Sequence, residues 1–106
     1  MKASQQYESE FRLIRRKIEE GAYGLALYRL VLLQSSAISN EDVKAIKAAN
    51  DLEALIRRII WQDFSKIALE RRLIVTPENL RMLMEEHSRH YIRYMALVSS
   101  NLSKKY

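Results

Sequence analysis

The sequence predicts an all-α protein with no sheet, arranged as a bundle of about four helices, of which one or two are long. Two observations carry this prediction. Glycine occurs twice and proline once in 106 residues, far too few for the many turns of a small β-sandwich or barrel. Apolar residues, 48% of the chain, recur at steps of three and four. The length suits one α-helical domain over residues 1–106 with a core of its own.

The first predicted helix covers residues 4–20. Its apolar stripe steps by four and three through Tyr7, Phe11, Ile14 and Ile18. Gly21 follows the last periodic residue, where a glycine commonly ends a helix.

A second helix is expected over residues 22–34, and it is apolar almost all round. Its large side chains are Leu25, Leu27, Leu30, Val31, Leu32 and Leu33. A helix without a polar face is either central in the fold or covered by a partner. The polar residues 35–40 predict a break after it.

Helical spacing resumes at Val43 and continues to about residue 72. Ser39 or Asn40 is the expected N-cap, and Ser39 with Asp42 resembles a capping box. A helix of about 30 residues would span about 45 Å, so part of it should be exposed or should cross several neighbours. Asn-Asp at residues 50–51 is where we expect a kink or break.

After a short apolar connector at residues 73–75, Thr76-Pro77-Glu78 predicts a helix start. The helix should run to about residue 101. A heptad-like seam along it comprises Leu80, Met84, His87, Tyr91, Tyr94 and Val98.

Charge and composition restrict the partners and the compartment. A net charge of +5 and a pI near 9.6 favour nucleic acid, an anionic membrane or an acidic protein surface, without choosing among them. The sequence has no cysteine, which excludes disulfides and thiolate zinc sites, and no apolar run of the roughly 20 residues that a bilayer span requires. We therefore expect a cytoplasmic protein.

No pattern in the sequence indicates catalysis, so we expect neither an enzyme nor a bound cofactor. Glu86 with His90, and His87 with His90, have the spacing of neighbours on a helix face. A metal site needs three or four convergent ligands, so we predict none. Nucleophile elbows and phosphate-binding glycine loops are absent.

Two sets of residues are candidates for binding. The candidate partner interface consists of large apolar and aromatic side chains: Leu30, Leu33, Trp61, Phe64, Tyr91 and Tyr94. The candidate patch for nucleic acid or an acidic partner consists of Arg57, Arg58, Lys66, Arg71, Arg72, Arg89 and Arg93. Trp61 could stack on bases or anchor an interface, and we favour the anchor, because tryptophan is common at the centre of protein interfaces.

Residues 52–100 resemble the α-helical domain of GINS subunits, which belong to the archaeal and eukaryotic replicative helicase complex. The resemblance rests on 55–60 (Leu-Ile-Arg-Arg-Ile-Ile), 66–68 (Lys-Ile-Ala) and 76–78 (Thr-Pro-Glu), followed by Leu83 and Met84. Asp63 departs from the pattern, since an arginine is common at that position. Residues 1–50 match only in helix order, and the small β-domain usual in the family has no counterpart here.

The resemblance implies a scaffold role in DNA replication. GINS subunits assemble into a tetramer through long helices, bridge the MCM ring and a RecJ-like partner, and contact polymerase or primase. We therefore expect an oligomer or an obligate member of a complex, with at most weak, non-specific contact to nucleic acid. Two alternatives stay open: a small helical subunit of a CRISPR effector complex, or an accessory subunit of a replicative DNA polymerase.

Overall fold

The computed structural model describes residues 7–105, with side chains described as far as residue 100. Within that range the chain forms five helices and no strand, so the all-α prediction is confirmed. The helices are α2 (Glu8–Glu19), α3 (Tyr23–Ser39), α4 (Val43–Glu70), α5 (Pro77–His87) and α6 (Arg89–Lys105). The part of the first predicted helix at residues 4–6 lies outside the described residues.

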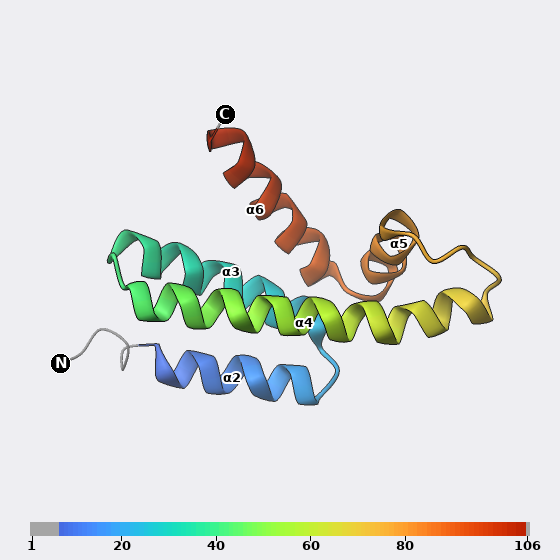
Figure 1. Ribbon diagram of the computed structural model, residues 1–106, viewed down its shortest axis with the longest axis horizontal. Coiled ribbons are helices and arrows are strands. Elements are labelled where there is room, and N and C mark those ends of the chain that lie inside the picture. The colour runs from blue at the N-terminus through green and yellow to red at the C-terminus, as the bar shows by residue number, and fades with distance from the viewer. Residues whose placement is uncertain (1–6, 106) are drawn as a thin grey trace.

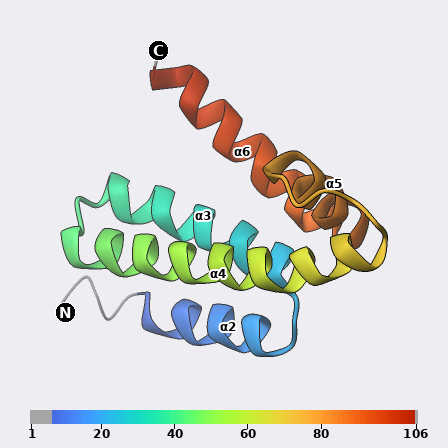
Figure 2. The ribbon, with the colours of Figure 1, turned by 45° about the vertical axis from the view of Figure 1, so that its right-hand side comes forward.

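Helix α3 is the centre of the fold, as its nearly uniform apolar sequence predicts. It contacts α2, α4 and α6, and its buried residues lie on several sides of the helix. In Figure 1, α2, α3 and α4 lie side by side, and α5 lies near the C-terminal end of α4. Helix α6 starts against this group and then diverges from it, which Figure 2 shows from a second direction. The apolar faces of α2–α6 therefore meet mainly around α3.

Helix α2 uses the predicted stripe. Tyr7, Phe11 and Ile14 are buried, and Ile18 packs against the same core. The Tyr7 hydroxyl accepts a hydrogen bond from Asn40 Nδ2 at 2.6 Å, and it lies 3.1 Å from the Ser36 hydroxyl. Across the same interface, Arg29 Nε of α3 donates to Glu10 Oε1 of α2 at 2.8 Å. Apolar burial and these polar contacts together hold α2 on α3.

The predicted break at residues 35–40 is wrong, because α3 continues through Ser39. Ala37 of this segment is completely buried, so tertiary packing retains the helix where the polar composition suggests a loop. The N-cap of α4 is consequently Asp42 and not Ser39 or Asn40. The Asp42 carboxylate accepts a hydrogen bond from the backbone N–H of Ala45 at 3.1 Å.

Helix α4 passes through Asn50-Asp51 without interruption, so the predicted kink is absent. Ala49 and Leu52, on either side, are buried, and Asn50 Oδ1 accepts a hydrogen bond from Gln34 of α3 at 3.2 Å. The predicted long helix is otherwise confirmed: 28 residues correspond to about 42 Å, most of the molecule's 51 Å length.

The single helix predicted after Thr76 is two helices. Thr76 is the N-cap as expected, accepting from the N–H of Asn79 at 3.1 Å, with Pro77 at the first position of α5. At Ser88 the backbone becomes extended, with φ −150° and ψ 124°, and α6 leaves in a new direction. The seam is therefore divided, because α5 packs on α4 while α6 packs on α3.

Three helices, α2, α3 and α4, end in the same backbone conformation, in which the residue after the C-cap has a positive φ. This residue is Gly21 (79°), Glu41 (54°) or Arg72 (58°). At the first of them, Ala22 N–H donates to Lys17 O and Gly21 N–H to Ile18 O, the paired bonds of a Schellman motif. Gly21 confirms the predicted helix end. Glutamate and arginine adopt the same conformation at a steric cost that glycine does not have.

Candidate functional site

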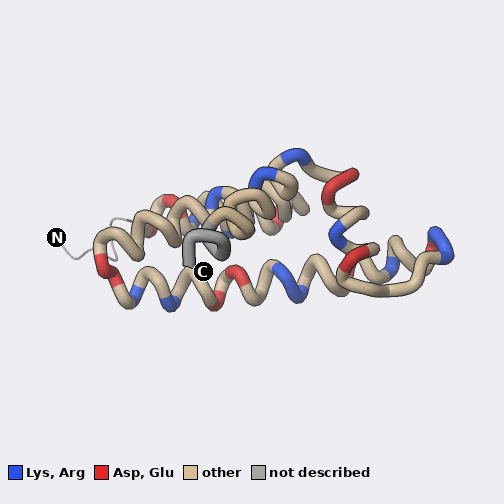
Figure 3. The backbone as a smooth tube through the Cα atoms, turned by 90° about the horizontal axis from the view of Figure 1, so that it is seen from above, with Lys and Arg blue, Asp and Glu red and all other residues tan. Residues whose placement is uncertain are grey.

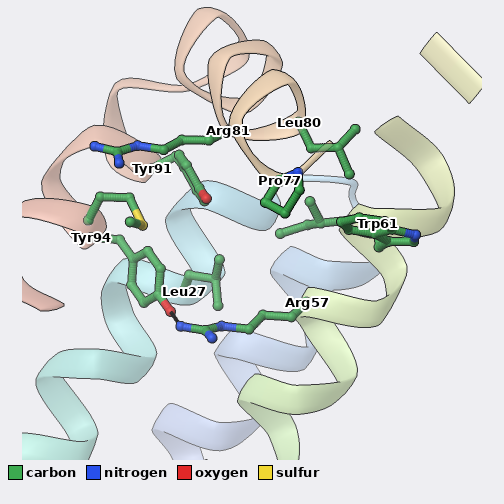
Figure 4. Close-up of a pocket in the computed structure, with 10 residues that line it drawn as sticks. Leu27, Arg57, Trp61, Pro77, Leu80, Arg81, Tyr91 and Tyr94 are labelled. Carbon is green, nitrogen blue, oxygen red and sulfur yellow. Dashed lines mark hydrogen bonds between the residues drawn. The ribbon is translucent and has the colours of Figure 1, made fainter. Parts of the chain in front are cut away.

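A cleft of about 330 Å³ opens where α3, α4, α5 and α6 meet, beside Trp61. Figure 4 shows its lining side chains arranged around an open centre. We call it the Trp61 cleft, and its lining residues are Leu27, Arg57, Ile60, Trp61, Pro77, Leu80, Arg81, Tyr91, Tyr94 and Met95. Most of these are apolar or aromatic, and the two charged members are both arginines.

The helix breaks described above position the lining. Leu27, Ile60 and Leu80 belong to the core and form an apolar wall contributed by three helices. Thr76 starts α5 so that Pro77 faces Trp61 (Figure 4). The change of direction at Ser88 brings Tyr91 and Tyr94 of α6 to the opposite side. A continuous helix from residue 77 onward would not form this arrangement, so the cleft depends on the α5–α6 break.

Tyr94 connects α6 to α4 at the base of the cleft. Its side chain is 1% exposed, and its hydroxyl donates to Glu53 Oε2 at 2.7 Å while accepting from the Arg57 guanidinium at 2.7 Å. Arg57 and Glu53 lie 3.7 Å apart, so the three groups form one network. Burial raises the pKa of Tyr94 well above its usual value of 10, which keeps the hydroxyl neutral.

Tyr91 presents a second neutral hydroxyl toward the centre of the cleft (Figure 4). Burial raises its pKa above 10, and the nearby Arg57 and Arg81 act in the opposite direction. Among the described residues, no hydrogen bond is formed by this hydroxyl, whereas Arg81 Nε donates to Glu85 at 2.9 Å. The cleft can therefore donate hydrogen bonds from Tyr91 and from the guanidinium nitrogens of Arg57.

The structure divides the six predicted interface residues into two groups. Leu30, Leu33, Phe64 and Tyr94 are at most 5% exposed and form part of the chain's own core, so they offer almost no surface to a partner, although Tyr94 also lines the base of the Trp61 cleft. Their apolar spacing reflects internal packing between α3, α4, α5 and α6. The cleft brings together three of the six, the buried Tyr94 with Trp61, 46% exposed, and the half-buried Tyr91, and the last two have surface that a partner can reach.

The predicted basic residues do not form one patch. Arg57 is in the Tyr94 network, and Arg71 donates to Glu86 at 2.9 Å. The others, all exposed, are Arg58, Lys66, Arg72, Arg89 and Arg93. Positions 57 and 71 are about 20 Å apart along α4. Figure 3 shows Lys and Arg segments spread over the molecule and interrupted by acidic ones. The seven candidate cations are therefore dispersed along α4, just beyond its C-terminal end and on α6.

Sequence reasoning missed Leu27 and Met95 of the lining and Glu53 of the Tyr94 network. Leu27 and Met95 were hidden among many apolar residues of helical spacing. Glu53 and Arg57 had a detectable signal, because residues four apart on a helix are neighbours. Nothing in the sequence, however, places them beside Tyr94, 41 and 37 residues further along the chain.

The two histidines considered for metal binding contact different aromatic rings. His87 is exposed and contacts the Phe64 ring edge-on, with centroids 5.6 Å apart. His90 follows the helix break and lies near Tyr28, with ring centroids at 6.1 Å. Across the described residues, no group of three or more possible metal ligands gathers. No described helix is long and apolar enough to cross a membrane.

No protein-family model, curated protein or solved structure matches the chain in the comparisons made. The fold class is thus defined by the helices themselves, and the resemblance to GINS subunits stays a prediction.

Proposed function

We propose that this chain is a non-catalytic adaptor subunit that joins a multiprotein assembly through the Trp61 cleft. The observation that carries the proposal is Trp61 itself, a large indole that is 46% exposed at the rim of an apolar cleft. Aromatic side chains of this kind, next to an apolar depression, are typical anchors of protein interfaces. A replication assembly is the setting that the resemblance of residues 52–100 to GINS subunits implies.

The distribution of the basic residues favours a protein partner over nucleic acid. Non-specific nucleic-acid binding depends on several cations that follow the phosphate backbone together. In this chain two of the seven predicted cations are in ion pairs and the rest are dispersed. We therefore expect nucleic-acid contact to be weak and to disappear as salt is raised.

The test compares assembly with single-strand binding in the same variant. The chain is first co-purified from its native host so that mass spectrometry names the partner. Trp61→Ala should then weaken association with that partner by about 2 kcal/mol or more, measured by sedimentation, because the indole would lose its apolar contacts. Single-strand binding, measured by fluorescence anisotropy, should change little.

The control is Arg58→Ala with Lys66→Ala, two exposed cations outside the cleft lining, which should flatten the salt dependence of nucleic-acid binding and leave assembly unchanged. All variants must first give the wild-type circular dichroism spectrum. If Trp61→Ala leaves assembly intact and abolishes single-strand binding, Trp61 is a base-stacking residue and the adaptor proposal is wrong.

A further inference from the structure

Three hollows on the described surface differ in the balance of their charges. In the hollow beside Phe64, Arg71 and Glu86 both line the wall and pair with each other at 2.9 Å. In the hollow between α2 and α3, Arg29 and Glu10 do the same at 2.8 Å. The Trp61 cleft is lined by Arg57 and Arg81 and by no acid. Each arginine pairs with an acid outside the lining, Arg57 with Glu53 at 3.7 Å and Arg81 with Glu85 at 2.9 Å, so the charged groups that face an occupant are hydrogen-bond donors and not carboxylates.

The polar groups of the cleft also differ in how many of their hydrogen bonds are already made within the chain. The Tyr94 hydroxyl already donates to Glu53 and accepts from Arg57. The guanidinium of Arg57 has five N–H donors and its side chain is 57% exposed, so several donors remain for an occupant. The neutral Tyr91 hydroxyl points to the same space. An occupant that supplies an oxygen acceptor, and above all a carboxylate, would satisfy these donors.

The size of the cleft favours side chains of a peptide over a whole small molecule. At about 330 Å³ it lies at the lower end of small-molecule sites. Trp61 at its rim is 46% exposed, whereas a small-molecule site normally encloses most of its ligand. One or two apolar side chains can occupy the wall formed by Leu27, Ile60 and Leu80, while the rest of the segment stays outside.

We propose that the Trp61 cleft binds a short acidic segment of the partner, in which apolar side chains contact this wall and a neighbouring carboxylate pairs with Arg57 and Tyr91. The proposal rests on the adaptor function above and adds the chemistry of the partner. A second copy of this chain is a poorer match, because each copy carries a net charge of +5.

The probes are two amphipathic peptides of about four helical turns. Both peptides have leucines at the same positions. Every polar position is glutamate in the Leu/Glu peptide and lysine in the Leu/Lys peptide. Trp61 is the chain's one tryptophan, so its fluorescence reports occupation of the cleft directly. We expect the Leu/Glu peptide to shift the Trp61 emission with saturation, and the Leu/Lys peptide to bind at least tenfold more weakly.

Three variants locate the carboxylate. Arg57→Gln should weaken binding of the Leu/Glu peptide about tenfold, since a hydrogen bond to a charged group is lost. Tyr91→Phe should weaken it severalfold, and it leaves the bonds of Tyr94 untouched, so it guards against a purely structural effect of Arg57→Gln. The matched control is Arg58→Gln, an exposed neighbour outside the lining, which should bind as wild type does.

Three outcomes would each overturn the acidic-segment proposal. They are equal binding of the two peptides, equal effects of Arg57→Gln and Arg58→Gln, and no shift of the Trp61 emission with either peptide. The adaptor function is decided separately by Trp61→Ala and the native partner. Loss of assembly in Trp61→Ala without a preference for the acidic peptide retains the function and rejects the charge argument.

Discussion

Gly24→Ala should destabilise this fold although alanine is the better helix former. Gly24 is the second residue of α3 and is buried against the α5–α6 break. A Cβ atom at this position would lie 2.8 Å from Ser88 Cβ and 3.0 Å from the backbone nitrogen of Tyr91, and would also overlap the Ser88 hydroxyl. Ser88 Cβ is bonded to the backbone and Tyr91 N is part of it, so rotation of the Ser88 hydroxyl cannot relieve the overlap and α6 must move away from α3 to accommodate the methyl group.

Two opposing effects set the magnitude. Overpacking of a tight contact costs about 1–3 kcal/mol. Exchanging glycine for alanine gains at most about 1 kcal/mol in a helix interior, and we expect less in a first turn. The clash should win, so Gly24→Ala should lower the free energy of unfolding by about 1–2 kcal/mol.

Urea denaturation followed by circular dichroism and by Trp61 fluorescence measures this change. A double-mutant cycle with Ser88→Gly tests the cause, because that change removes the Ser88 side chain from the contact and should restore part of the lost stability. The cause is wrong if the two changes are simply additive. If Gly24→Ala is as stable as wild type or more stable, the close approach of α3 and α6 is not a constraint on this fold.

Two further predictions concern the helix ends and the Tyr94 network. Glu41→Gly should stabilise the chain by about 0.5–1 kcal/mol, because relief of the positive φ exceeds the extra entropy of glycine in the unfolded state. The control Glu20→Gly, at an ordinary φ of −77°, should not stabilise it. Equal urea midpoints for the two variants would refute the argument. Tyr94→Phe should cost about 1–2 kcal/mol at neutral pH. Because the pKa of Tyr94 is raised in the folded state, its contribution is complete below about pH 10 and is lost as pH rises toward the raised value. Urea midpoints measured from pH 9 to 11 should therefore fall less steeply in Tyr94→Phe than in wild type, and parallel curves would contradict the assignment.

Most of the helical content was predictable because it depends on local periodicity. The stripe through Tyr7, Phe11 and Ile14, the glycine end at Gly21 and the Thr76 start all appear where the sequence places them. Each depends on residues within one or two turns of each other, which a linear sequence shows directly.

The errors occurred where distant contacts override local preference. Ala37 of α3 and Leu52 of α4 are both buried in the core, so helices continue through segments that composition marks as a break or a kink. The helix break at Ser88 lies in an unbroken helical pattern, and the sequence gives no reason to place it there. At this break Ser88 packs closely against Gly24, 64 positions earlier, which has no side chain to keep it away.

The sequence by itself determined that this protein is helical and basic and that α3 is nearly apolar all round, because these properties belong to single segments. Tertiary structure decided which large side chains remain accessible. Phe64 and Trp61 are both candidate interface residues in the sequence, but in the fold Phe64 is buried and Trp61 is 46% exposed. The difference arises because different faces of α4 lie against α3, against α5 and toward solvent. Which face is covered is decided only when the neighbouring helices are in place.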